Sequence, residues 1–121
     1  MKFAKIVFWG AGIWGLLTLT PLYFIFDSIG RQDPPAITHP GFYYGFAGVA
    51  LAWQFAFLVI AKDPLRFRLM MIPCVLEKLG FGIPVIVLYT QRRIGASDLA
   101  FGCIDLLLGA LFLVAFGATA A

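Results

Sequence analysis

Charged residues are scarce in this chain, and their scarcity excludes most classes of soluble protein. Asp, Glu, Lys and Arg make up 12% of its 121 residues, whereas the apolar and aromatic types together make up 62%. A soluble domain usually has about a quarter of its residues charged and under half apolar. A soluble enzyme, a disordered tail and a nucleic-acid-binding module are therefore excluded, and lipid is the expected solvent.

Cysteine and histidine are also rare, with two of the first and one of the second. No Cys-x-x-Cys pair or Cys/His cluster has the spacing of a metal site, so we expect no metal and no cofactor. The single histidine excludes a bis-histidine haem site within one chain. Cys74 and Cys103 fall near opposite membrane faces, too far apart for a disulfide, which requires Cα atoms within about 7 Å.

Long apolar runs dominate what is present, at 6–26, 42–61, 69–90 and 99–121. Each has about the 20 residues that a helix needs to cross a hydrocarbon core of about 30 Å. The sequence predicts an all-α fold, an integral membrane four-helix bundle in up-down-up-down order, with one polar loop between its first two helices. A single domain covers 1–121, with spans at about 5–26, 42–61, 66–90 and 98–118.

The few Lys and Arg residues flank the apolar runs, where they orient a membrane protein. The N-terminus and the second connection carry more of them than the first and third connections do. The positive-inside rule therefore predicts that both termini lie in the cytoplasm. The cytoplasmic set is Lys2, Lys5, Lys62, Arg66 and Arg68, and the opposite set is Arg31, Arg92 and Arg93.

Small and polar residues recur at helical spacing and predict the faces that pack together. The first run is rich in small residues, which let membrane helices approach closely. In the second run, a small and polar stripe is expected to face inward. A similar stripe follows Ser97 in the fourth run. The three sets are Gly10, Ala11, Gly12 and Gly15; Tyr43, Ala47, Ala50 and Gln54; and Asp98, Gly102, Asp105 and Gly109.

The third helix has a recognisable start signal. Asp63 followed by Pro64 resembles an N-cap carboxylate before a proline at the first helical position. We therefore expect this helix to run from Pro64 to about Thr90, with a kink site at Pro84. A helix of that length exceeds the membrane core, so it must tilt, kink or place its first turn at the interface.

Three charged residues stand inside predicted spans, namely Glu77, Lys78 and Asp105. Charge within a membrane is costly, and its default interpretation is a functional site facing the bundle interior. Gln54 lies at nearly the depth of Glu77, so a hydrogen bond between them is expected, while Lys78 can extend toward Asp105. Either these residues form an interhelical network that fixes helix register, or they line a midplane cavity for a polar headgroup, a proton or a substrate.

The connection at 27–41 is the longest and most polar, and its prolines favour a loop or short re-entrant cap outside the hydrocarbon. His39 is the only histidine, and a loop histidine before proline is usually a capping or surface residue. If it acts in chemistry, its partners are expected at the same membrane face: Asp27, Asp33, Tyr43 and Tyr44.

Two segments look like family motifs: HPGFYYGF at 39–46 and EKLGFG at 77–82. With its size, its four spans, its polar first connection and its charged later spans, the chain resembles the DoxX-like bacterial membrane proteins. The resemblance implies a location in the bacterial inner membrane and supplies no catalytic residue.

Three hypotheses for function remain open. The first is a non-enzymatic bundle that serves as a subunit or accessory protein of a larger membrane assembly, or as a homo-oligomer. The second is binding or transport of a small hydrophobic or amphipathic ligand by Gln54, Glu77, Lys78 and Asp105. The third is a membrane enzyme acting on a lipid through His39 and nearby acids.

Overall fold

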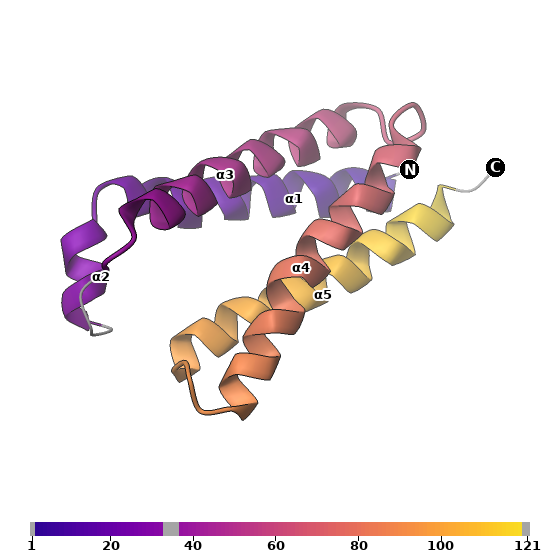
Figure 1. The fold of residues 1–121 in the computed structure, drawn as a ribbon. Helices are drawn as coiled ribbons and strands as arrows, with labels where there is room; N and C mark the ends of the chain where they lie inside the picture. The colour runs from indigo at the N-terminus through magenta and orange to yellow at the C-terminus, as the bar shows by residue number, and fades with distance from the viewer. Residues whose placement is uncertain (1, 33–36, 120–121) are drawn as a thin grey trace.

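The chain is built from helices throughout the residues that the structure, a computed structural model, describes, namely 2–32 and 37–119 (Figure 1). Four helical segments in this part are long and apolar enough to cross a membrane: Lys2–Tyr23, Pro40–Lys62, Arg68–Thr90 and Ala96–Ala118. The elements are α1 (Lys2–Leu19), the 3-10 turn η1 (Thr20–Tyr23), α2 (Phe26–Gln32), α3 (Pro40–Lys62), the 3-10 turn η2 (Arg68–Met70), α4 (Met71–Thr90) and α5 (Ala96–Ala118).

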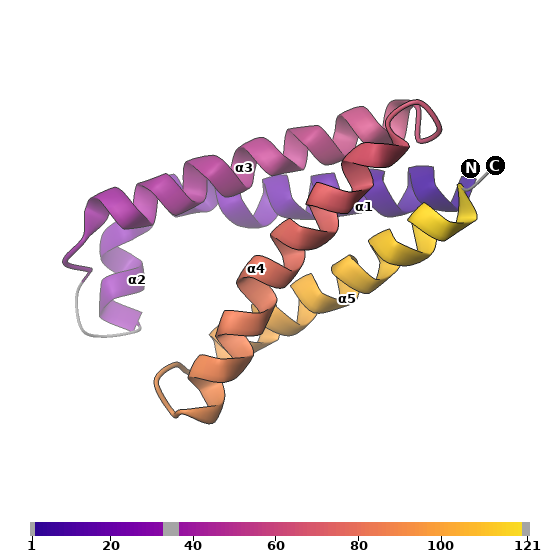
Figure 2. The same cartoon turned by 45° about the vertical axis from the view of Figure 1, so that its right-hand side comes forward.

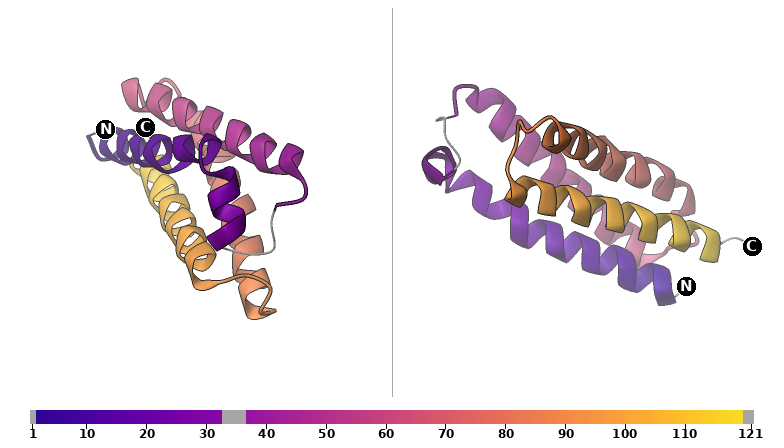
Figure 3. Two further views of the ribbon diagram at one scale, coloured as in Figure 1. Left: turned by 90° about the vertical axis from the view of Figure 1, so that its left-hand side faces the viewer. Right: turned by 90° about the horizontal axis from the view of Figure 1, so that it is seen from below.

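The long helices form two pairs, α1 with α3 and α4 with α5. The pairs meet at the end of the molecule that carries both termini, which we call the terminal end, and they diverge toward the other end (Figures 1 and 2). Between the pairs, α1 contacts α5 more than α3 contacts α4, and both contacts are smaller than those within each pair. The view from below shows α5 and α1 aligned in projection (Figure 3), whereas Figures 1 and 2 show that the two helices approach at the terminal end and separate toward the other end.

Glycines set the close approach of α1 to α3. Gly12 and Gly15 are buried, and a Cβ on Gly12 would stand 3.0 Å from the backbone oxygen of Gln54. Gly10, in contrast, has open space where its Cβ would lie. The predicted small-residue face of the first helix is therefore confirmed at Gly12 and Gly15 and wrong at Gly10, which points away from the partner helix.

The second pair uses the stripe predicted in the last helix. Gly102 and Gly109 are buried against α4, where added Cβ atoms would lie 2.9 Å from the Cβ of Val85 and 3.2 Å from that of Lys78. Asp105 lies between the two glycines on the same face. Because the glycines remove side-chain bulk, α4 can approach α5 closely at the level of Lys78.

Three phenylalanines fill the core where the pairs meet. Phe8 stacks on Phe112 with ring centroids 4.2 Å apart, and Phe57 meets Phe112 edge-on at 5.0 Å. All three side chains are fully buried, and they come from α1, α3 and α5. Met71 and Cys74 of α4 join this core. One aromatic cluster thus joins the two helix pairs at the terminal end.

The outer surface carries large apolar side chains that are mostly exposed. Leu17, Phe24, Phe42 and Leu69 are among the most exposed of them. Such a surface is stable in lipid and not in water, in agreement with the four membrane-length helices. Both cysteines are free, with Cys74 buried and Cys103 exposed.

The predicted start of the third membrane helix was wrong. Asp63 ends α3, residues 64–67 form turns, and α4 begins only at Met71 after η2. Pro73 favours the later start. In a helix begun at Pro64, it would stand in the interior and break the bond to the carbonyl of residue 69, whereas in α4 it occupies the first turn, where no intrahelical bond is lost.

Asp63 still caps a turn, because its Oδ1 accepts a hydrogen bond from the backbone N–H of Arg66 at 3.3 Å. Pro84 lies inside α4 as expected, and the helix continues past it to Thr90.

The polar connection at 27–41 contains more helix than predicted. Phe26–Gln32 forms α2, and α3 begins at Pro40, so that Pro40 and Gly41 stand in its first turn. Proline is favoured at this position because its missing N–H would have no partner there. The predicted loop is thereby shortened, and Asp33 lies outside the described residues.

Candidate functional site

Lys78 is the centre of the charged residues inside the spans. Its Nζ lies 3.4 Å from Oδ1 of Asp105 on α5 and 3.6 Å from Oε1 of Glu77, its own neighbour on α4. The side chain of Lys78 is 5% exposed, against 17% for Glu77 and 19% for Asp105. We call these three residues the charged cluster. The structure therefore pairs the three charges directly.

The ring of Phe57 packs against the ammonium group of Lys78. The Nζ of Lys78 stands 5.0 Å from the centroid of the Phe57 ring, a cation–π distance. Phe57 belongs to the aromatic core at the terminal end, so this contact joins the charged cluster to that core. The ammonium is held between that ring and the two carboxylates, and Gly109 provides the space beside its stem.

The charge of the cluster is not balanced. With both carboxyl groups ionised, Glu77 and Asp105 contribute two negative charges and Lys78 one positive charge. Oε2 of Glu77 is buried and has no hydrogen-bond partner among the described residues. A carboxylate oxygen without a donor is costly in a low-dielectric environment. The net negative charge and the unpartnered oxygen consequently allow the cluster to accept one further proton, cation or hydrogen-bond donor.

Gln54 does not join the charged cluster, and the expected hydrogen bond to Glu77 is not formed. Its Nε2 donates to the backbone oxygen of Ala50 at 2.7 Å, and its side chain packs against Gly15 of α1. Oε1 of Gln54 is buried without a partner among the described residues. The stripe to which Gln54 belongs does face inward, but the helix that it faces is α1.

Tyr43 and Tyr44, two of the loop candidates, lie at the end opposite to the termini, where they form an aromatic group with Phe26. The hydroxyl of Tyr43 donates to the backbone oxygen of Leu22 at 2.7 Å, and the Phe26 ring meets Tyr43 edge-on and stacks on Tyr44. These contacts attach α2 to the start of α3. Tyr43 therefore has a structural task that occupies its hydroxyl.

His39 and Asp27 are both exposed, and within the described residues no hydrogen bond or ion pair joins them. The His39 ring packs edge-on against Phe42, with centroids 5.8 Å apart. The described residues thus assemble no acid–base pair around His39.

Two residues with clear roles escaped the sequence reasoning. Phe57 looked like any apolar residue of a span, yet its ring packs against the ammonium group of Lys78. Arg68 was counted only as an orienting charge, but its guanidinium lies 3.7 Å over the ring of Phe116, and its Nε donates to the Phe116 carbonyl at 3.1 Å. No local sequence signal distinguishes either residue, because both roles depend on a helix distant in the chain.

Comparisons with protein-family models, curated proteins and solved structures find no match to this chain. Among residues 2–32 and 37–119, no group of three or more His, Cys, Asp or Glu side chains could hold a metal ion.

Proposed function

We propose that this chain is a non-enzymatic membrane protein that works as a subunit or accessory protein of a larger membrane assembly, or as a homo-oligomer. The observation that carries the proposal is the direct pairing of Lys78 with Glu77 and Asp105. Paired charges fix the register of α4 against α5 and leave the exposed helix faces as the surface for partners.

The proposal includes the placement of the chain in a bilayer. The four helices cross in up-down-up-down order, and both termini lie in the cytoplasm because the terminal end carries the larger set of Lys and Arg residues. The resemblance to DoxX-like proteins supports the bacterial inner membrane.

The test is crosslinking in the intact membrane. A photoreactive residue at Leu17 or Leu107, both largely exposed, should yield a defined adduct with a second copy or with one other membrane protein. The matched control is the same residue at Phe112, which is fully buried and should give no adduct. A chain that gives only lipid adducts at both exposed positions and has a monomer's mass in nanodiscs would contradict the proposal.

A second candidate function is binding or transport of a small amphipathic ligand at the charged cluster and Gln54. The observation in its favour is Oε2 of Glu77, a buried oxygen with no donor among the described residues; Oε1 of Gln54, which packs against α1, is a second such oxygen. A ligand with an ammonium or amide group would supply the missing donor and balance the negative charge.

This alternative is tested with Glu77→Gln and Asp105→Asn, which keep side-chain shape and remove charge. Uptake or efflux of a panel of hydrophobic amines should fall at least tenfold in both variants. Asp27→Asn, at an exposed site on α2, is the control and should behave as wild type. Unchanged transport in well-folded Glu77→Gln and Asp105→Asn proteins would eliminate this candidate.

A further inference from the structure

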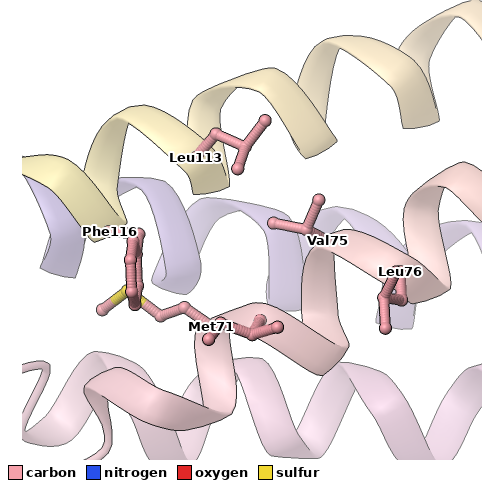
Figure 4. Close-up of a pocket in the computed structure, with 6 residues that line it drawn as sticks. Met71, Val75, Leu76, Leu113 and Phe116 are labelled. Atoms are coloured by element: carbon pink, nitrogen blue, oxygen red, sulfur yellow. The ribbon is translucent and has the colours of Figure 1, made fainter.

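An apolar groove lies between the start of α4 and the end of α5 (Figure 4). Its volume is about 140 Å³, and Met71 and Phe116 line it near the terminal end of the molecule. For comparison, a cavity of about 150 Å³ with a similar lining takes up benzene. The full lining is Met71, Ile72, Val75, Leu76, Leu113 and Phe116.

The groove is long enough to hold part of a hydrocarbon chain. Its α4 residues extend from Met71 to Leu76, which corresponds to about 8 Å along the helix axis. Leu113 and Leu76 are exposed, whereas Met71 and Val75 are buried beneath them. The groove is thus open along the outer face of α4 and α5, where lipid chains would lie.

A cation stands at the terminal end of this groove. Arg68 directly precedes the groove along the chain, and its guanidinium lies over Phe116, one of the lining rings. The bond to the Phe116 carbonyl occupies only its Nε. No acidic side chain among the described residues pairs with Arg68, so its terminal N–H groups are available for a bidentate contact with a phosphate.

We propose that the groove binds one acyl chain of an anionic phospholipid, whose phosphate contacts the Arg68 guanidinium. Lys62, the last residue of α3, and Arg66, in the connection that follows, add positive charge at the headgroup level. A basic pocket next to apolar helix surface at the cytoplasmic side is the usual chemistry of an anionic-lipid site.

Charge also argues against a second copy as the occupant. A twofold axis along the membrane normal would place the Lys62, Arg66 and Arg68 of one copy beside those of the other. Like charges in juxtaposition disfavour such an interface. A phospholipid instead satisfies the apolar groove and the cation together.

The test measures lipid retention by the full chain in detergent, using native mass spectrometry with phosphatidylglycerol and phosphatidylcholine as probes. Wild type should retain phosphatidylglycerol more strongly, by about fivefold for one arginine, because the choline ammonium of phosphatidylcholine offsets its phosphate charge whereas phosphatidylglycerol keeps a net negative charge. Arg68→Gln should remove the preference, and Arg68→Lys should restore part of it. Arg92→Gln, at the opposite end of α4, is the charge-matched control and should leave the preference unchanged.

A second variant probes the groove without touching the cation. Leu113→Trp at an exposed lining position should fill the groove and reduce retention of both lipids, whereas Leu17→Trp on α1 should not. Equal retention of the two lipids by wild type, or equal losses in Arg68→Gln and Arg92→Gln, would overturn the proposal. So would a wild-type dimer without lipid preference that Leu113→Trp dissociates, because the groove would then be an interface between copies.

Discussion

Lys78 is the residue on which the charged cluster depends. It is the one cation near two carboxylates inside the spans, and its side chain is almost completely buried against Phe57. Without it, Glu77 and Asp105 would either carry negative charge in a low-dielectric environment with no counterion or have to take up protons, and both cost free energy. Breaking a buried ion pair by removing one partner is far more destabilising than replacing the whole set by neutral groups.

Lys78→Met should therefore destabilise the folded chain strongly, by about 3 kcal/mol. The measurement is the free energy of unfolding from denaturant titration in mixed micelles, followed by circular dichroism. The triple variant Lys78→Met, Glu77→Gln and Asp105→Asn is the control, and it should recover most of the loss because no unpaired charge remains. A triple variant as unstable as Lys78→Met alone would show that the lysine acts through packing and not through charge.

The close contact between helices depends on a few glycines. Their positions are not equivalent, as α1 and its partner α3 show. Gly12 faces α3, where a Cβ would lie 2.7 Å from Cδ2 of Leu58 and 3.0 Å from a backbone oxygen. Gly10, on the same helix, has nothing within 4 Å of such a Cβ. The two glycines therefore separate the effect of packing from the effect of helix propensity.

Gly12→Ala should destabilise the α1–α3 pair by about 1 to 3 kcal/mol, the usual range for overpacking. Gly10→Ala should be neutral or slightly stabilising, because alanine favours helix over glycine by about 1 kcal/mol. Thermal unfolding in the same detergent compares the two variants. Equal melting temperatures for both would contradict the described packing of α1 on α3.

The end of α4 uses a Schellman motif without the glycine that this motif favours. The N–H of Arg93 donates to the oxygen of Leu88, and that of Arg92 donates to the oxygen of Tyr89, both at 2.9 Å. Arg92 has a φ of 60°, in the left-handed region that is strained for a residue with a side chain.

Arg92→Gly should raise the free energy of unfolding by up to about 1 kcal/mol, because glycine adopts this conformation without strain. The control is Gly95→Ala at the start of α5, where φ is −90° and no atom lies within 4 Å of the new Cβ. Denaturant titration of both variants provides the measurement. A loss of stability in Arg92→Gly would mean that the arginine side chain outweighs the backbone strain.

The whole molecule is two helix pairs joined at one end by an aromatic core. Both chain termini and the connection between α3 and α4 lie at that end (Figure 2). Lys2, Lys5, Lys62, Arg66 and Arg68 belong to these segments, so the molecule has a basic end. The turn with Arg92 and Arg93 lies at the opposite end.

Reporter fusions should reveal this polarity in a bacterial inner membrane. Alkaline phosphatase, which is active only outside the cytoplasm, should be inactive at either terminus and active when fused after Arg93. A fluorescent protein that matures only in the cytoplasm should give the reverse pattern. Phosphatase activity at either terminus would contradict the orientation derived from the positive-inside rule.

Hydropathy and spacing alone were enough for the coarse fold. Four membrane-length helices, the inward stripe with Gln54 and the glycine stripe with Asp105 all follow from patterns within one segment. The start of α4 did not follow, because the Asp63-Pro64 signal competes with Pro73 farther along. The helix α2 was missed because the prolines around it suggested a loop.

The sequence by itself determined the solvent of the protein and the faces that its helices bury, since composition and helical period are local properties. Only the tertiary structure decided which faces meet. It turned Gln54 toward Gly15 instead of Glu77, and it placed Phe57 under Lys78. These pairings depend on the rotation and crossing of helices distant in the chain, which no local spacing encodes. Three of the few charged residues, Glu77, Lys78 and Asp105, form one cluster only because α4 packs against α5.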